Sequence, residues 1–369
     1  MTEKGDSGVT IDSSRERRVL DRIERARRRK PVVREDRITL AHGSGGKATH
    51  TLIDAVFLDA FRNPWLEPLD DGANLPVGSA RAVLTTDSYV VSPLFFPGGD
   101  IGDLAVNGTV NDLAVCGARP LYLSAGFILE EGFPVTDLRR ITASMAAAAE
   151  AAGVSIVTGD TKVVRRGQAD GCFITTAGVG LADRPVTLSA SAARPGDAVI
   201  VSGPIGDHGV TIMVARGELG IETALTSDTA PLHALVADLL DALPDEVRAL
   251  RDATRGGVAT VLNEIATASG VSVVVDEATL PVRREVTGVC ELLGIDPMYV
   301  ACEGRLVAII DGAHADRAVE ILRGHPAGTG ATIIGTIKDD PPGLVLLRTT
   351  IGGTRIVDML IGDPLPRIC

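Results

Sequence analysis

Short apolar segments and amphipathic helical segments alternate along this chain from Ile38 onward, and this alternation constrains its fold more than any other feature. The content of 41 glycines and 20 prolines favours a loop-rich enzyme over a helical bundle. A chain of 369 residues is long enough for two domains. We therefore predict an α+β fold with domains at residues 38–183 and 184–345.

Two helices are the clearest predictions in the first unit, over Asp100–Cys116 and Thr136–Ala152. Asp100 and Thr136 are suitable N-caps, and a glycine follows each helix. Three strands are expected around them, over Ala80–Thr85, Val154–Thr158 and Cys172–Leu181.

The second unit has its strongest helical pattern over Gly256–Ser269, where Val258, Val261, Leu262 and Ile265 recur at helical spacing. Its other expected elements are a helix around His314–Leu322 and strands over Asp197–Ser202, Val271–Val275, Arg305–Asp311 and Ala331–Ile337.

The two ends of the chain differ from the rest. Residues 1–37 hold 12 Lys and Arg against 8 Asp and Glu, and the basic run Arg15–Lys30 has the pattern of an amphipathic helix. A solvated extension is the simplest interpretation, and an arm that binds a partner is the alternative. Residues 346–369 lack helical periodicity and contain Pro364 and Pro366, so we expect a mobile tail.

Composition excludes several classes of protein. A net charge of −12 argues against a nucleic-acid or anionic-membrane binder, and 3% aromatic residues provide few stacking platforms. No apolar run is long enough to span a membrane, and no signal peptide is evident. The five cysteines form no CxxC pair and no zinc-like cluster, which predicts a cytoplasmic protein with free thiols.

Aspartates recur after apolar strands and in glycine-rich turns, where a metal–nucleotide site would need them. Mg²⁺ prefers carboxylate and phosphate oxygens. The candidates are Asp71, Asp87, Asp112, Asp160 and Asp252. Each aspartate alone is equally typical of a helix cap or a turn. Asp103, Asn107 and Asn111 also form a polar stripe on an otherwise apolar helix.

Two glycine-containing segments carry a lysine that can bind phosphate. The first is HGSGGK, which ends in Gly45, Gly46 and Lys47 and lacks the spacing of a Walker A loop. A flexible turn before a helix explains it equally well. The second is GDTK, in which Asp160 and Lys162 are expected at a turn after a strand. A surface lysine is the alternative there.

Glu303 and Cys369 are the candidates for the reacting groups. Glu303 lies between two apolar segments, so burial would raise the pKa of its carboxyl and suit it to act as a base. A salt bridge to Arg305 is the competing interpretation. Cys369 is the last residue of a flexible tail, and such a thiol can reach into a site and be modified. A chance terminal cysteine is the simpler alternative.

Together these segments resemble the HypE family of hydrogenase expression/formation proteins, which lies in the superfamily of aminoimidazole ribonucleotide synthase and selenophosphate synthetase. The resemblance runs from His42 to Cys369. The motifs that carry it are HGSGGK, TTDSYVVSPLFFPGGDIG, GTVNDLAVCGARP, GDTKVV, SGPIGDHG, RDATRGG and the terminal PRIC. Residues 1–37 have no counterpart in this pattern.

The resemblance implies an ATP-dependent carbamoyl dehydratase of [NiFe]-hydrogenase maturation. Cys369 would receive a carbamoyl group from the carbamoyltransferase HypF. The oxygen of this carbamoyl group would then attack the γ-phosphate of ATP. Loss of phosphate and a proton would leave a thiocyanate, whose cyanide passes to iron on a HypC–HypD complex. The superfamily fold implies a homodimer that pairs through the N-terminal sheets.

The resemblance also implies a role for each candidate. Asp71, Asp87, Asp112 and Asp252 would hold Mg²⁺ and ATP, together with Gly45, Gly46, Lys47 and Asn111. Asp160 and Lys162 would lie near the phosphates, and Glu303 would be the base. The alternatives are another ATP-using enzyme that phosphorylates an amide or selenide, and a non-catalytic nucleotide-binding scaffold whose basic arm recruits a partner.

Overall fold

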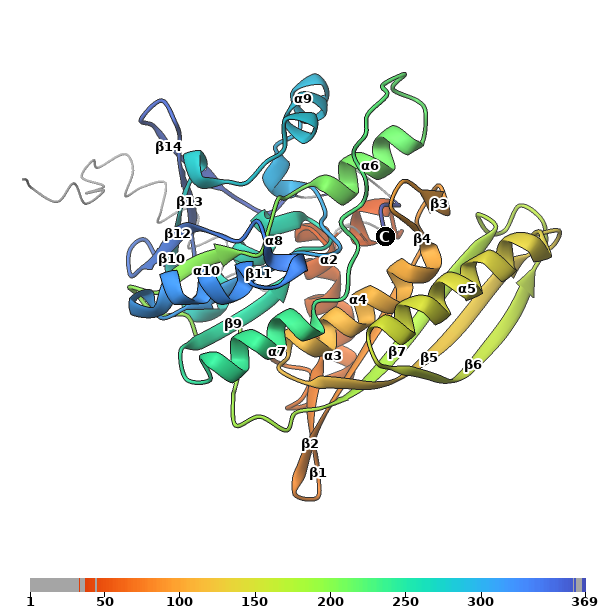
Figure 1. The fold of residues 1–369 in the computed structure, drawn as a ribbon, viewed down its shortest axis with the longest axis horizontal. Helices are drawn as coiled ribbons and strands as arrows, with labels where there is room; N and C mark the ends of the chain where they lie inside the picture. Colours follow the sequence, from red (N-terminus) through yellow and green to blue (C-terminus); the bar gives the residue numbers. More distant parts are fainter. Residues whose placement is uncertain (1–32, 34–36, 44, 361, 363–366) are drawn as a thin grey trace, which may run out of the picture.

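The computed structural model describes residues 33, 37–43, 45–360, 362 and 367–369, and it confirms the α+β class (Figure 1). Two sheets with their covering helices form the two halves of the molecule. The predicted basic helix at Arg15–Lys30 lies outside the described residues. Within the described part, no helix has the length and apolar character that a membrane crossing requires.

The N-terminal half is built on a five-stranded sheet in the order β1-β2-β7-β5-β6. Helices α4 and α5 cover one of its faces, and buried residues such as Val83, Leu123 and Ile174 point toward them. The elements are β1 (Ala73–Val77), β2 (Ala80–Tyr89), α4 (Ile101–Val115), β5 (Arg119–Glu130), α5 (Val135–Ala151), β6 (Ser155–Val164) and β7 (Cys172–Leu181).

Helix α4 begins where the sequence predicts. Asp100 accepts hydrogen bonds from the backbone N–H groups of Gly102 and Asp103, and the Asp103 side chain accepts one from the Asp100 N–H, so the two form a capping box. The helix is apolar on nearly all sides and nearly all of its residues are buried. It therefore lies between the two halves, where it packs on the N-terminal sheet and on α7 and β9 of the other half.

The C-terminal half contains a seven-stranded sheet in the order β14-β13-β10-β12-β8-β11-β9. Helix α8 packs on one face and helices α7 and α10 on the other, which explains why β8 and β11 are buried along their whole length. The strands are β8 (Ala198–Val201), β9 (Val247–Asp252), β10 (Ser272–Asp276), β11 (Leu306–Ile310), β12 (Thr332–Lys338), β13 (Val345–Arg348) and β14 (Thr354–Val357).

Helices and short turns complete the chain. The helices of the C-terminal half are α6 (Asp207–Ala215), α7 (His233–Ala242), α8 (Gly257–Ser269), α9 (Arg284–Leu293) and α10 (Ala315–Arg323). The segment before β1 holds the 3₁₀ turn Leu40–Gly43, α2 (Lys47–Leu52), the π-helical turn Ile53–Phe57 and α3 (Leu58–Phe61). Short strands β3 (Phe95–Phe96) and β4 (Gly99–Asp100) precede α4.

Three predictions of local structure are corrected. The N-cap of α5 is Pro134 rather than Thr136, because the helix begins earlier than expected. Strand β6 continues through the GDTK segment, which pairs with β5 and forms no turn there. Residues Thr354–Val357 of the predicted tail form β14, which pairs with β13, so the C-terminal sheet extends past the expected boundary.

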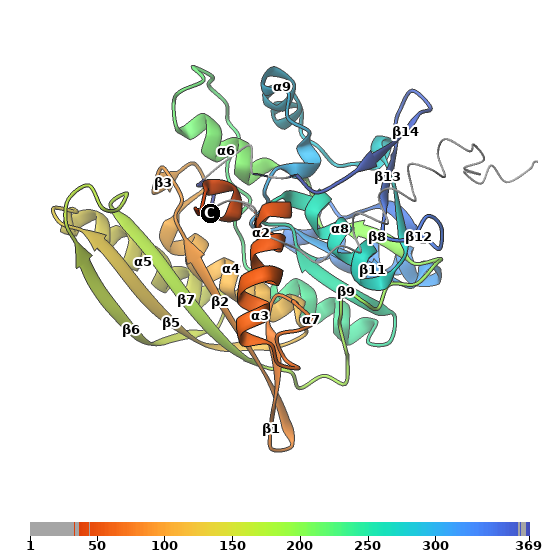
Figure 2. The same ribbon diagram turned by 180° about the vertical axis from the view of Figure 1, so that it is seen from behind.

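Over β5, β6 and β7, no described helix covers the face of the N-terminal sheet that points away from α4 and α5. Apolar side chains on this face are exposed, among them Leu84, Tyr122, Ile128 and Val179. Strand β6 forms the edge of the same sheet, and nearly all of its residues are exposed. In Figure 2, α2 and α3 lie beside β2, and no helix lies in front of β5, β6 and β7.

Candidate active site

A cavity of about 430 Å³ lies between the two halves and contains four of the predicted aspartates. Its walls come from the segment before β1, from β2, from α4 and from the turn between β9 and α8. The residues that line it are Gly45, Thr49, His50, Ile53, Trp65, Leu66, Leu69, Asp70, Asp71, Ala73, Thr86, Asp87, Asp112, Arg251, Asp252, Thr254, Arg255, Thr260 and Glu264.

Asp71, Asp112 and Asp252 meet at one point of this cavity. One oxygen of each carboxylate lies within 4.8 Å of an oxygen of the other two. They come from three places in the sequence: the turn before β1, the last turn of α4 and the end of β9. Thr85 of β2 ties two of them together, because its hydroxyl lies 2.7 Å from an Asp112 carboxylate oxygen and 2.8 Å from the Asp71 carbonyl oxygen.

Burial disfavours the ionised form of these carboxylates. Desolvation raises the pKa of Asp71 to about 6 and raises the pKa values of Asp112 and Asp252 well above their usual range. Their neighbouring carboxylates raise the pKa values further. A divalent cation would offset this repulsion, and three hard oxygen donors at this spacing suit Mg²⁺. The residues present therefore fit the metal predicted from the sequence.

Arg251 is a functional candidate that the sequence analysis missed. It is buried at the end of β9, beside Asp252, and its guanidinium forms an ion pair with Asp71 and lies 3.5 Å from Asp70. Arg251 supplies one positive charge to a cavity wall that carries six carboxylates and one other arginine, Arg255. The preceding apolar residues of the strand predict its burial, but its partners lie far away in the sequence.

Asp87 lies inside β2 and not in a turn after it. Its carboxylate lines the cavity and accepts a hydrogen bond from the Tyr89 hydroxyl at 3.0 Å. Its charge also raises the pKa values of Asp112 and Asp252, so it belongs to the same electrostatic cluster. The structure brings this fourth predicted aspartate to the same cavity without placing it in the group of three.

Glu303 is buried in the loop before β11, with only 3% of its surface exposed. Its Oε1 atom has no hydrogen-bond partner, and burial raises the pKa of its carboxyl well above the usual range. The predicted competitor for Glu303 is engaged elsewhere, because Arg305 binds backbone carbonyl oxygens and lies 3.6 Å from Asp228. Gly304 permits this turn, since a Cβ there would overlap the carbonyl oxygen of Asp228.

Asn111 connects α4 to the Glu303 loop. Its amide nitrogen donates to the carbonyl oxygens of Ala230 at 3.0 Å and Glu303 at 3.2 Å, and its oxygen accepts from the Leu232 N–H at 2.7 Å. The side chain thus holds the two halves together next to the site. Its predicted contact with a nucleotide stays a prediction.

Cys369 lies at the end of β2, next to these acidic groups. The backbone N–H of Val90 donates to the Cys369 carbonyl oxygen at 3.1 Å, three residues after Asp87. The pKa of Arg255 is raised chiefly by the negative charge at Cys369, and further by Asp87 and Glu303. The charges of the terminal residue, Asp87 and Glu303 therefore all act on one guanidinium group, which the sequence analysis did not single out.

The glycine loop borders the same cavity. Gly45 has a φ of +78°, and a Cβ there would meet the Arg255 side chain at 2.9 Å, so the loop backbone lies against Arg255. Gly46 is the N-cap residue of α2. The Lys47 ammonium forms an ion pair with Asp358 just beyond β14, and its backbone N–H donates to the Leu360 carbonyl oxygen.

Asp160 and Lys162 are not brought to the cavity of the same chain. They lie on the edge strand β6, where they form an exposed ion pair at 2.7 Å. Three strand spacings separate β6 from β2, or about 14 Å. The register places both side chains on the uncovered face of the sheet, opposite to the face of Asp87.

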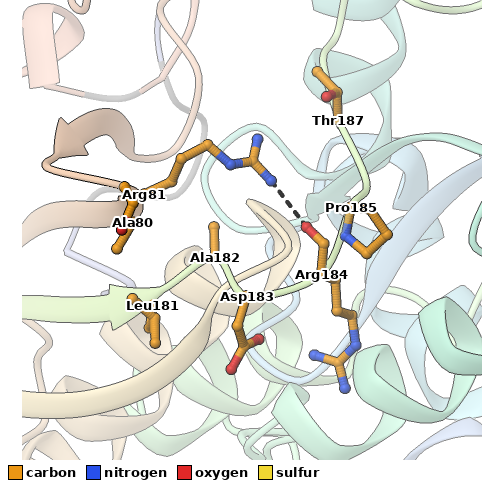
Figure 3. Close-up of a pocket in the computed structure, with 9 residues that line it drawn as sticks. Ala80, Arg81, Leu181, Ala182, Asp183, Arg184, Pro185 and Thr187 are labelled. Carbon is orange, nitrogen blue, oxygen red and sulfur yellow. Dashed lines mark hydrogen bonds between the residues drawn. The ribbon is translucent and has the colours of Figure 1, made fainter.

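A second hollow, of about 560 Å³, lies at the linker between the halves (Figure 3). Arg81 of β2 donates there to the carbonyl oxygens of Arg184 and Val186, and Arg184 pairs with Asp241 at 2.6 Å. These arginines are engaged in holding the linker. None of the residues predicted for the site lines this hollow.

Two sequence families match the chain. Residues 69–182 match the N-terminal domain of AIR synthase related proteins, and residues 194–346 match the C-terminal domain. The predicted division between residues 183 and 184 stays a prediction.

Curated relatives cover almost the whole chain. The carbamoyl dehydratase HypE of Azotobacter vinelandii is 54% identical over 337 residues, which are 91% of this chain and 98% of the relative. The carbamoyl dehydratase HypE of Escherichia coli K12 is 48% identical over 337 residues, 90% of this chain and 99% of the relative.

Solved structures agree with these sequence relatives. The chain superposes on HypE in a HypE–HypF complex with a TM-score of 0.79 and 48% identity, covering 84% of this chain and 99% of the other. A HypE structure in complex with ATP gives a TM-score of 0.76 and 47% identity, with coverage of 90% and 100%. A thiamine monophosphate kinase from Aquifex aeolicus shares the fold at 19% identity and a TM-score of 0.57, with coverage of 83% and 96%.

Proposed function

Because this chain belongs to the HypE family of carbamoyl dehydratases, we propose that it uses ATP to dehydrate a carbamoyl group carried on its own Cys369. The observation that carries this proposal is the position of Cys369. Its carbonyl oxygen accepts a hydrogen bond from the Val90 N–H, three residues after Asp87, and its negative charge raises the pKa of Arg255. A group attached to this thiol would be held at the acidic cavity at a high effective concentration.

The reaction balances as one dehydration. The carbamoyl oxygen attacks the γ-phosphorus of ATP, the bond to the β–γ bridging oxygen breaks, and ADP leaves. The nitrogen then loses its two protons, one as the O-phosphorylated group becomes a neutral imidate and one as the C–O bond breaks and phosphate departs, so that the S-bound carbon becomes a nitrile. Phosphorylation is needed because hydroxide is a poor leaving group and phosphate is a good one.

Asp71, Asp112 and Asp252 are the residues that would hold Mg²⁺. When bound, the ion would neutralise charge on the phosphates. Arg251 and Arg255 line the same cavity and can attract the nucleotide's negative charge. Trp65, Leu66 and Ile53 line the same cavity and provide its apolar lining.

Glu303 is the candidate base for the proton on nitrogen. Its unpartnered Oε1 is free to accept that proton, and burial strengthens it as a base. The positive charge of Arg255 favours the ionised form that a base requires, because it lowers the pKa of Glu303. The negative charges of Glu303 and Cys369 both raise the pKa of Arg255, so the three groups belong to one electrostatic cluster.

A homodimer would give Asp160 and Lys162 a role. Both face outward on β6, on the sheet face that carries exposed apolar side chains. Pairing of two such faces would bury the apolar residues and bring the Lys162 ammonium toward a second copy. We propose that Lys162 acts near the phosphates of the partner's site, since it lies on the wrong face for its own.

The partners follow from the chemistry of the thiol. HypF is the proposed carbamoyl donor, since a relative forms a complex with it, and a HypC–HypD complex is the proposed acceptor of cyanide. All five cysteines are free thiols, which fits a reducing compartment such as the cytoplasm.

Intact-mass spectrometry tests the proposal. The chain is incubated with a HypF carbamoyltransferase, carbamoyl phosphate and ATP, and then with Mg²⁺. We expect a carbamoyl adduct on Cys369, followed by an adduct lighter by one water. An adduct that forms and never loses water in the presence of ATP and Mg²⁺ would contradict the proposed reaction.

A further inference from the structure

The last three residues are held by contacts that the reaction itself does not require. Helix α6 supplies two of the groups involved: His208 in its first turn and Arg216 just after its end. Both donate to backbone carbonyl oxygens of the tail. Figure 2 shows the C-terminal end between α6 and the segment that carries β3.

His208 is fully buried and binds the tail through a fixed set of hydrogen bonds. Its Nε2 lies 2.9 Å from the Ile368 carbonyl oxygen, which can only accept, so Nε2 carries the proton. Its Nδ1 then accepts from the Ser227 hydroxyl at 2.7 Å. Burial lowers the pKa of His208 to about 4, so the ring is neutral at pH 7, and it packs edge-on against Phe96.

Arg216 joins the tail to the end of the N-terminal sheet. Its Nη2 donates to the Arg367 carbonyl oxygen at 2.9 Å, and its Nε donates to the Ser92 carbonyl oxygen at 3.0 Å. The Ser92 N–H also donates to the Arg367 carbonyl oxygen at 3.1 Å. Arg367 has a φ of +59°, a conformation that an L residue keeps only where its surroundings hold it.

The side chain of Ile368 anchors the segment. Only 3% of its surface is exposed, and it joins the apolar cluster that contains Val91, Phe96 and Val210. Cys369, the next residue, is half-buried. A tail seated in this way presents its backbone to α6 and keeps the terminal residue at Val90, where β2 has just ended.

We propose that His208 and Arg216 are positioning residues that hold Arg367 and Ile368 and thereby set the place of Cys369 for dehydration. Seating of the tail is then an equilibrium that opposes delivery of the thiol to a carbamoyl donor. Weakening the contacts of His208 and Arg216 with the tail slows dehydration, whereas carbamoyl transfer to Cys369 stays as fast or becomes faster. This inference rests on the proposed function for its catalytic consequence alone.

Alkylation of Cys369 by iodoacetamide measures the seating directly, without any turnover. The C-terminal peptide is quantified by mass spectrometry at fixed pH in the wild type, Arg216→Ala, Arg216→Lys and the exposed control Arg139→Ala. Loss of a charge-assisted hydrogen bond corresponds to about tenfold or more in an equilibrium. We expect Arg216→Ala to be alkylated about tenfold faster, Arg216→Lys to lie between, and Arg139→Ala to match the wild type.

Ile368→Ser provides a second variant, which changes the tail and leaves His208 and Arg216 intact. It should be alkylated faster by a similar factor, and its melting temperature should fall by only about 2 °C, which is the stability that the seated tail supplies. Equal alkylation rates in the wild type, Arg216→Ala and Ile368→Ser would overturn the inference. The carbamoyl transfer and water loss of the same variants are then followed by mass. Failure of the wild type to form or dehydrate its adduct would count against the proposed function and leave the alkylation result standing.

Discussion

Removal of one carboxylate from the group formed by Asp71, Asp112 and Asp252 should stabilise the protein while it weakens the response to Mg²⁺. At a separation of 4.8 Å and an effective dielectric constant of about 20, each pair of ionised carboxylates repels by about 3.5 kcal/mol. The pKa of Asp71 is raised from 3.8 to about 6, chiefly by desolvation and further by neighbouring carboxylates, which corresponds to about 3 kcal/mol for its ionisation in the fold. Arg251 offsets part of the repulsion.

We choose Asp112→Asn as the perturbation, because an amide oxygen can still accept the hydrogen bond from Thr85. We expect the free energy of unfolding of the metal-free protein to rise by about 2 kcal/mol at pH 8. With an unfolding entropy of about 2.1 cal/mol/K per residue, this is about 2 to 3 °C in melting temperature for 369 residues. Mg²⁺ should then stabilise the wild type and have little effect on the variant. A ligand at 100 times its Kd stabilises by about 2.7 kcal/mol.

The pH dependence has a definite sign. The folded-state pKa of Asp112 lies above its unfolded value, so the wild type loses stability as the pH rises from about 4 through the folded pKa. The amide that Asp112→Asn introduces cannot ionise, and the two proteins should therefore differ little below pH 4 and diverge above it.

Differential scanning calorimetry from pH 4 to 8, with and without Mg²⁺, measures both effects. Asp238→Asn is the matched control, since Asp238 is exposed in the middle of α7. The electrostatic reasoning is refuted if Asp112→Asn is less stable than the wild type at pH 8 and Mg²⁺ raises both melting temperatures equally.

Four further predictions concern the reaction. Cys369→Ala should abolish the mass gain from carbamoylation, and an adduct on this variant would place the chemistry on another residue. Glu303→Gln should form the carbamoyl adduct and retain it in the presence of ATP, with a folding stability at pH 7 no lower than the wild type, because a buried carboxyl with a raised pKa destabilises the ionised fold; a normal rate of water loss would exclude Glu303 as the base. Lys162→Ala should slow ATP hydrolysis by at least about tenfold, and a wild-type rate would remove Lys162 from the site. If Lys162 acts across a dimer, a mixture of Lys162→Ala and Glu303→Gln chains should recover activity that neither variant has alone, and analytical ultracentrifugation should give a dimer; a monomer at micromolar concentration would contradict this arrangement.

The sequence predicted most elements because their signals are local. The capping box of α4 lies within four residues, and the helical spacing of Val258, Val261 and Ile265 marks α8 without reference to any other segment. The aspartates were predictable as a class, since a carboxylate after an apolar strand is evident in the sequence. The structure then places Asp71, Asp112 and Asp252 together.

Long-range pairing accounts for the rest. The glycine of GDTK indicates a turn locally, but pairing with β5 keeps Asp160 and Lys162 in an extended strand. Thr354–Val357 has no strong strand signal of its own and becomes β14 through its register with β13. Arg251 and Arg255 were missed because what defines them is the set of charges around them, and these come from segments far apart in the chain.

The burial of α4 from both sides limits how this protein can be taken apart. The helix belongs by sequence to the N-terminal family, yet Asn111 and the apolar residues of its last turns are completed by the other half. A fragment that ends at residue 183 would expose the apolar side of α4 that packs on the other half. The fragment that begins at residue 184 would lack the surface of α4 on which α7 packs. The two halves therefore match separate sequence families without being separable modules. A chimera that joins the halves of two relatives should fold only when the residues facing α4 come from the same parent as the helix.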